Sequence, residues 1–251
     1  MKYFFFVAIA VFFVGCNNNK KQETIVQNST TITKEQTLKN AVAQYPDSLQ
    51  LIENLSAYYL DVQNYDAALA QINNAIGRDS NNAALRDYQS IIYIAKGDTV
   101  QAIKSLEKAI IILPNPQYII GLGALYAQTK NPMALVMADA LIAADKAGAE
   151  KEAYFIKGIY YSYTNEKEKA IPFFDKCISI QYTFMDAYLE KGIALYDVKK
   201  YIEAATVLET AVTLQNNFER GYYYLGRCFE KLNKKEDAIE AYQIALMYDP
   251  N

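Results

Sequence analysis

The chain has 251 residues, 52% of them hydrophobic, and a formal net charge of −3, values that are ordinary for a globular protein. A mildly acidic chain offers no basic stripe to neutralise phosphates, so we expect no nucleic-acid partner. The absence of histidine removes the commonest general base and the commonest zinc ligand.

The amino-terminal residues have the pattern of a secretory signal. A positively charged start precedes an uninterrupted apolar run from Tyr3 to Val14, shorter than the about 20 residues that a membrane-spanning helix needs. The run ends in "FVGC" at Cys16, which resembles a bacterial lipobox, although Phe13 departs from its usual aliphatic residue. The resemblance implies that residues 1–15 are a lipoprotein signal peptide and that Cys16 is lipidated. The alternative is an ordinary secretory signal with an incidental cysteine.

The next segments connect this anchor to the body of the protein. Residues 16–30 are polar and unpatterned, which is typical of a flexible tether. Residues 31–48 contain Leu38 and Ala41 on one helical face, and Pro46 follows. We interpret this segment as a half-repeat, a single helix that caps the amino-terminal end of the residues after it.

From residue 49 onward the sequence repeats with a period of 34. In the last unit, small or apolar residues take positions 4, 7, 8, 11, 20, 24 and 27, and proline takes position 32; they are Tyr222, Leu225, Gly226, Phe229, Ala238, Tyr242, Ala245 and Pro250. This pattern resembles the tetratricopeptide repeat (TPR) at every signature place. The period divides the chain into six units: 49–82, 83–116, 117–150, 151–184, 185–218 and 219–251.

The spacing has a physical meaning that is independent of the family. Positions 4 to 11 and positions 20 to 27 each follow one face of a helix. Small residues at positions 8 and 20 suit the close approach of two antiparallel helices. Because one helix pair cannot bury its apolar faces alone, the pairs must stack. The sequence therefore predicts an all-α fold, and the resemblance implies a right-handed α-solenoid of tandem helix-turn-helix repeats with a concave side.

The unit at 117–150 keeps its length but blurs the signature. In one interpretation Ala124, Val136 and Ala143 fill positions 8, 20 and 27. In the other, the turn is one residue shorter and Ala134 takes the place of position 20. The unit is either a degenerate repeat held by its neighbours or a functional hinge.

Catalytic chemistry is not indicated. Cys177 and Cys228 lie 51 residues apart, in units too distant for a disulfide, and their repeat positions favour burial as small apolar residues. We expect no metal site, no cofactor and no enzymatic activity.

The resemblance implies that the first helix of each unit lines the concave face, chiefly through positions 2, 5, 9, 12 and 13. The wall then runs from acidic, through apolar and aromatic, to basic. It lacks the Lys and Asn pair, at positions 5 and 9, that the family uses to clamp chaperone carboxyl termini. The candidate groove residues are Tyr118, Leu125, Phe155, Ile159, Tyr163, Leu189, Ile193, Tyr196, Tyr223 and Arg227.

These features together predict a membrane-anchored scaffold that binds an envelope protein or peptide in an apolar and aromatic groove and assists assembly of an envelope complex. The outline resembles the pilotin lipoproteins of type IV pili and the repeat lipoprotein of the outer-membrane barrel assembly machinery. Short Asp-Ser and Asp-Thr motifs at 47–49 and 98–100 resemble glycosylation sites of Bacteroidota lipoproteins. We expect attachment to the outer membrane, facing the periplasm or the cell surface. The alternative is a structural lipoprotein that self-assembles through an uncapped carboxyl-terminal repeat.

Overall fold

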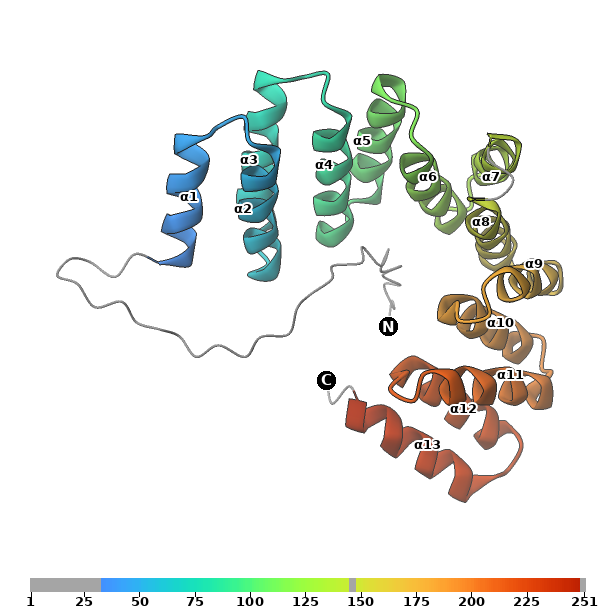
Figure 1. The fold of residues 1–251 in the computed structure, drawn as a ribbon. Helices are drawn as coiled ribbons and strands as arrows, with labels where there is room; N and C mark the ends of the chain where they lie inside the picture. Colours follow the sequence, from blue (N-terminus) through green and yellow to red (C-terminus); the bar gives the residue numbers. More distant parts are fainter. Residues whose placement is uncertain (1–32, 145–147, 249–251) are drawn as a thin grey trace. The chain divides into compact units, whose positions relative to one another are not determined.

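The fold is seen in a computed structural model that describes residues 33–144 and 148–248. Cys16 and the tether lie outside these residues. Across the two described ranges all regular structure is helical, which confirms the all-α prediction (Figure 1). None of the helices in them combines the length and the apolar character that crossing a membrane requires.

The chain divides into two units, Met1–Ser80 and Asn81–Asn251. The first contains α1 (Lys34–Gln44), α2 (Leu49–Asp61) and α3 (Tyr65–Arg78). The second contains α4 (Ala83–Lys96), α5 (Thr99–Ile112), α6 (Pro116–Gln128), α7 (Met133–Ala144), α8 (Glu150–Tyr163), α9 (Lys167–Ile180), α10 (Met185–Asp197), α11 (Tyr201–Leu214), α12 (Glu219–Lys231) and α13 (Lys235–Tyr248). From residue 49 onward the helices follow one another in pairs, and α6 and α8 begin at Pro116 and Glu150, one residue before the predicted units 117–150 and 151–184.

The turn inside each pair is built in the same way. One residue of the turn has a left-handed backbone, with φ between 55° and 83°; these residues are Gln63, Gly97, Lys130, Asn165, Lys199 and Asn233. The following residue donates its backbone N–H to a carbonyl oxygen at the end of the first helix, as Lys200 does to Leu195 at 2.9 Å. This is the Schellman arrangement, which satisfies carbonyl groups that the end of a helix leaves unpaired.

The small residue at position 8 permits the two helices of a pair to approach closely. A Cβ atom added at Gly192 would lie 2.7 Å from Cγ of Leu208, and one at Gly226 would lie 2.7 Å from the ring of Tyr242. Ala204, at position 20, is fully buried. The expected role of the small positions is therefore confirmed.

The structure decides between the two interpretations of 117–150. Ala134, Ala138 and Leu141 are fully buried, whereas Val136 is 51% exposed. Ala134 therefore takes the place of position 20, and the turn is one residue shorter. The first helix is displaced as well, because Gly123 is buried and Ala124 only partly so; a Cβ added at Gly123 would lie 2.8 Å from Cδ1 of Ile156 in α8 and 3.3 Å from Cβ of Met137 in α7.

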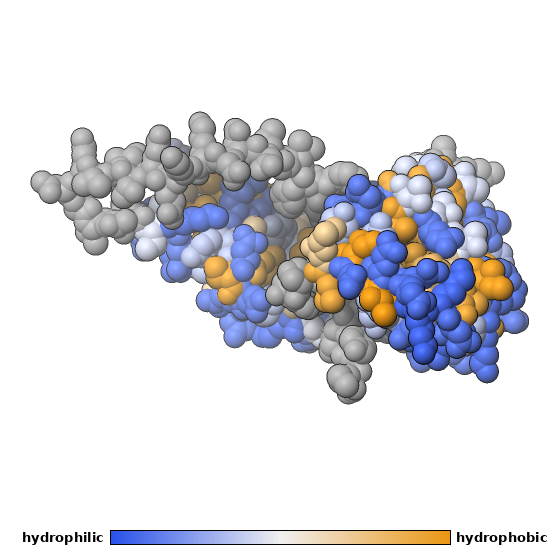
Figure 2. Space-filling view, turned by 90° about the horizontal axis from the view of Figure 1, so that it is seen from below, coloured by the Kyte–Doolittle hydropathy of each residue, from blue (hydrophilic) through white to orange (hydrophobic). Residues whose placement is uncertain are grey.

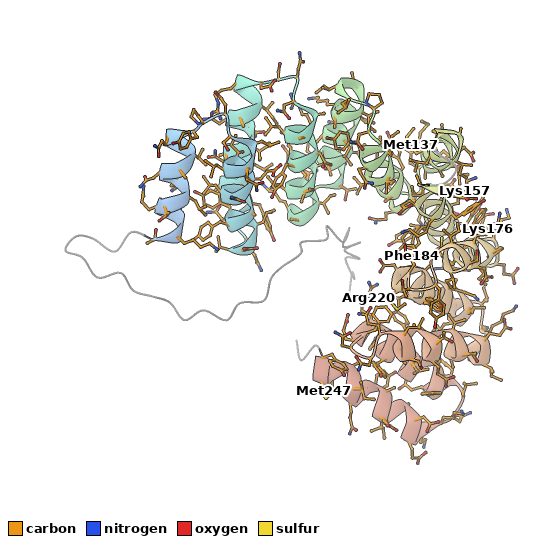
Figure 3. All side chains as sticks on the ribbon, viewed as in Figure 1. Met137, Lys157, Lys176, Phe184, Arg220 and Met247 are labelled. Carbon is orange, nitrogen blue, oxygen red and sulfur yellow. The ribbon has the colours of Figure 1, made fainter. Side chains whose placement is uncertain are left out.

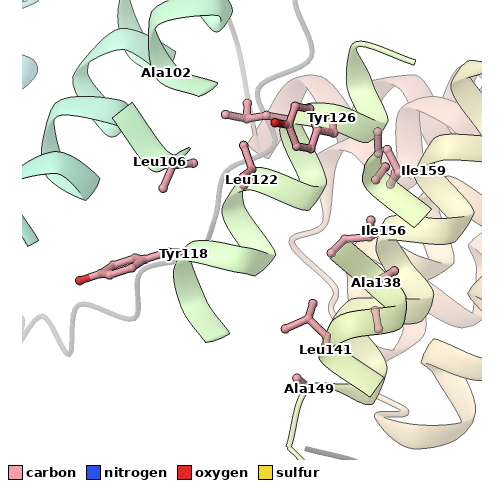
Figure 4. Packing of buried hydrophobic residues seen from close by; sticks show 14 of the residues in the cluster. Ala102, Leu106, Tyr118, Leu122, Tyr126, Ala138, Leu141, Ala149, Ile156 and Ile159 are labelled. Atoms are coloured by element: carbon pink, nitrogen blue, oxygen red, sulfur yellow. The ribbon is translucent and has the colours of Figure 1, made fainter. Parts of the chain in front are cut away.

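The second unit has two cores. One lies among α4 to α9 and includes Leu106, Ile156 and Phe174; the other lies among α10 to α13 and includes Leu208 and Phe229. Figure 4 shows Leu106 and Ile156 within the first core.

Of the two described cysteines, Cys228 belongs to the core of α10 to α13. Cys177 and Cys228 are free thiols and are fully buried, as the sequence predicts. Burial raises the pKa of Cys177 to about 12, so this thiol stays protonated and unreactive at neutral pH.

Candidate functional site

The candidate surface lies on the first helices of the repeats in the second unit. There α6 contacts α8, α8 contacts α10, and α10 contacts α12. In Figure 1 these helices form the inner side of this unit, and α7, α9 and α11 lie outside them. Arg220 of α12, labelled in Figure 3, lies on this inner side.

Half of the predicted groove residues are buried and offer little surface to a partner: Tyr118, Leu125, Ile159, Leu189 and Ile193. For this half, the expectation of an open wall is wrong. Consecutive first helices contact one another, so each covers the apolar side chains of the next. Leu189 is the extreme case at 0% exposure, inside the core of α10 to α13.

The displaced register of α6 explains why two of these residues, Tyr118 and Leu125, are buried. Because α6 lies one position earlier than the repeat count implies, Tyr118 and Leu125 occupy the places that Ala187 and Ala194 take in α10, and both alanines are fully buried. Tyr118 belongs to the core of α4 to α9 (Figure 4).

Phe155 is partly buried and has a structural environment. Its ring meets Phe184 edge-on, with centroids 5.0 Å apart, and lies 5.9 Å from Phe174. It joins the pair α8–α9 to Phe184, the residue that precedes α10.

The remaining residues gather with one that the sequence did not indicate, Tyr224. We call Tyr163, Tyr196, Tyr223, Tyr224 and Arg227 the tyrosine–arginine patch. Tyr223 is 46% exposed, and the others are partly buried. The patch draws on α8, α10 and α12, so three repeats must stack before it exists.

Arg227 is the centre of the patch. Its guanidinium carbon lies 4.6 Å from the ring centroid of Tyr196 and 5.5 Å from that of Tyr224. Nη2 donates to the hydroxyl of Tyr196 at 3.4 Å. Tyr223 meets the ring of Tyr224 edge-on at 5.3 Å. Cation–π attraction therefore holds a positive charge on an aromatic surface.

Glu190 of α10 carries the most perturbed carboxyl group beside this patch. Burial raises the pKa of Glu190 to about 7, and the positive charges of Arg220 and Lys167 offset only part of that effect. Burial, followed by the charge of Glu190, also raises the pKa of Tyr163 to about 12. A carboxyl group that titrates near neutral pH marks a candidate functional position.

Sequence reasoning did not single out Glu190 or Tyr224 because both occupy position 6, outside the positions that the resemblance supplies. The signal that could have found them is the one-turn spacing within each helix. Glu190 follows Asp186 by four residues, and Tyr224 follows Arg220 by four, so each pair shares a face.

The chemistry of this surface is that of binding. Residues 33–144 and 148–248 contain no group of three acidic or cysteine side chains placed to hold a metal ion. The patch combines aromatic rings with one cation, which suits contact with a polypeptide.

Comparison with known proteins places this geometry in a family. The tetratricopeptide repeat family matches residues 54–115, 151–184 and 219–251. A TPR repeat-containing protein of Methanocaldococcus jannaschii is 26% identical over 228 residues, which cover 84% of this chain but only 38% of that protein.

Solved structures agree in fold. A tetratricopeptide repeat protein from Parabacteroides merdae superposes with a TM-score of 0.72 at 19% identity, covering 86% of this chain and 85% of that one. PilW, described as a widely conserved type IV pilus biogenesis factor, gives a TM-score of 0.66 at 18% identity, covering 80% and 92%. PilF of Pseudomonas aeruginosa gives 0.59 at 14% identity, covering 87% and 95%. The chain is therefore built from tandem tetratricopeptide repeats.

Proposed function

We propose that this protein is an interaction scaffold that binds a protein or peptide on the inner face of α8, α10 and α12. The observation that carries the proposal is the tyrosine–arginine patch. It presents several aromatic side chains and one cation on adjacent first helices, with Tyr223 46% exposed.

Aromatic residues and arginine are the side chains that contribute most to protein interfaces. They bury a large area while losing little conformational freedom, and a polar atom on each can still hydrogen-bond. The rings of the patch are already held by contacts with one another, so less freedom is lost when a partner binds. A preformed surface of this kind suits an extended or helical segment of another protein.

Site-specific photo-crosslinking tests the proposal. A photoreactive amino acid in place of Tyr223 should yield a crosslinked partner in cells of the native host. The matched control is Ile202 of α11, which is 71% exposed but lies on an outer helix. Equal crosslinking from both positions, or none from Tyr223, would remove the inner face from the function.

We further propose that Cys16 carries a lipid and that the partner belongs to a cell envelope. The lipobox-like "FVGC" and the polar stretch after it support this proposal. PilW, whose fold is similar, is described as a pilus biogenesis factor. The proposed location is the outer membrane, facing the periplasm or the cell surface, and the proposed activity there is assistance in assembling an envelope complex.

A second candidate function is self-association through α13. Ile239, Leu246 and Met247 of this helix are between 58% and 66% exposed. Figure 2 shows hydrophobic residues among hydrophilic ones on the side of the molecule where α13 lies. Light scattering over a range of concentrations should then show oligomers that Ile239→Glu with Leu246→Glu dissociates. A monomer at every concentration would exclude this candidate.

A further inference from the structure

We propose that Arg227 is a subsite for the carboxylate of an aspartate or glutamate side chain in the partner polypeptide. The inference rests on the proposed function and adds the chemistry of the segment that is bound: an acidic residue with apolar or aromatic residues on both sides.

The first step of the argument is the position of the guanidinium group. It rests over the rings of Tyr196 and Tyr224 at 4.6 and 5.5 Å, and Nη2 donates a hydrogen bond to the Tyr196 hydroxyl. A guanidinium has five N–H donors. Contact with the rings and one hydrogen bond to Tyr196 engage few of those donors, and a carboxylate can accept two parallel hydrogen bonds from the others.

The second step is charge. Lys167 pairs with Asp197 at 2.9 Å, and Arg220 faces Asp186 and Glu190. Arg227 differs from these cations, because its neighbours in the described part of the chain are tyrosines and no carboxylate there forms an ion pair with it. A partly buried cation without a carboxylate favours a partner that brings one, since desolvation has already weakened its hydration.

The third step concerns the form of the ligand. Arg227 has Tyr223, one turn earlier on its own helix, and Tyr196 of α10 among its neighbours, so aromatic side chains of two helices adjoin the cation. A segment that contacts both helices passes Arg227, which places the acidic residue inside the segment and makes it a side chain rather than a chain end.

A displayed peptide library tests the inference. The protein, expressed from its complete sequence and purified in detergent, is used to select random 12-residue peptides that have no free carboxyl terminus. Wild type should enrich Asp or Glu between apolar or aromatic residues, and Arg227→Glu should enrich Lys or Arg at the same place. Lys235→Glu changes the net charge equally from the exposed start of α13 and should select as wild type does.

A double-mutant cycle measures how strongly Arg227 favours an acidic peptide over its uncharged counterpart. A selected peptide and its Glu→Gln counterpart, both amidated, are titrated against wild type and Arg227→Gln, whose fold is checked by circular dichroism. Wild type should prefer the acidic peptide by about tenfold or more, as for a hydrogen bond between charged groups, and Arg227→Gln should lose that preference.

The outcomes separate the two proposals. Selection of apolar peptides without a charge preference would overturn the role of Arg227 and leave the scaffold intact. The same acidic preference in Arg227→Glu would also overturn it, because Arg227 would then have only a structural role. A wild type that enriches no peptide would overturn both.

Discussion

At the scale of single residues, the fold depends on glycine positions where two helices pack too closely for a larger residue. Gly192→Ala should lower the free energy of unfolding by about 1–3 kcal/mol, because the new Cβ forces strain into a filled core; it would lie 2.7 Å from Cγ of Leu208. Gly77→Ala is the matched control. Its added Cβ meets nothing within 4 Å, so the better helix former should stabilise α3 by about 0.5–1 kcal/mol. Urea unfolding measures both. If the two variants shift stability in the same direction, close helix contact is not what requires Gly192.

A second prediction at this scale concerns pH. The pKa of Glu190 is about 7 in the folded protein, above its ordinary 4.5. Between these values the folded chain holds a proton that the unfolded chain has lost, so stability contributed by Glu190 falls as the pH rises from about 5 to 7. The charged and titratable groups around it are Tyr163 of α8, Lys167 of α9, Asp186 and Asp197 of α10, and Arg220 and Tyr224 of α12.

Glu190→Gln should therefore flatten the dependence of stability on pH between 5 and 8, and Glu203→Gln, at an exposed carboxylate, should not. The chain has no histidine, so few other groups titrate in this window. Urea unfolding at both pH values is the measurement. An unchanged slope in Glu190→Gln would mean that Glu190 is ionised throughout.

At the scale of elements, the turns inside the repeats can be improved. Lys199 has φ of 65°, in the left-handed region, which costs a residue with a Cβ about 1–2 kcal/mol. Lys199→Gly should raise the melting temperature. Glycine removes the strain of the left-handed backbone, and this gain exceeds the cost of the greater conformational entropy of glycine in the unfolded chain. Gly97→Ala, at the corresponding turn with φ of 83°, should lower it. Lys200→Gly is the control, since Lys200 has φ of −85° and gains nothing from glycine. Equal melting temperatures for Lys199→Gly and Lys200→Gly would contradict this account.

The helices also show which features of the structure can be predicted from the sequence and which cannot. The helix pairs, their close contacts and the buried Cys177 follow from spacing, because one helical face repeats every 34 residues. The register at 117–150 does not, because Gly123 and Ala124 are both small enough for position 8 and only packing against neighbouring helices selects between them. Which side chains remain exposed on the inner helices is still harder to predict from the sequence. Leu189 and Tyr223 share position 5 in their units, yet one is fully buried and the other 46% exposed.

At the scale of the whole molecule, the proposals form one arrangement. In this arrangement a repeat array would recognise a segment of a partner through the tyrosine–arginine patch, and a lipid on Cys16 would hold the array at a membrane. The polar residues 16–30 would separate the two, so that binding and anchoring depend on different parts of the chain. The two activities should therefore be lost independently.

Cys16→Ser tests that independence. The variant should no longer incorporate a fatty-acid analogue or sediment with membranes, because the proposed anchor depends on this one residue. Its circular dichroism and thermal melt should match those of the wild type, since Cys16 lies outside the helices of the described residues, the first of which is Lys34–Gln44. Cys177→Ala is the matched control: it removes another cysteine, at a buried position where other repeats carry alanine, and should keep the label. Undiminished incorporation in Cys16→Ser would show that Cys16 is not the lipid site. If incorporation is lost and the released protein still crosslinks a partner from Tyr223, anchoring and recognition depend on different parts of the chain.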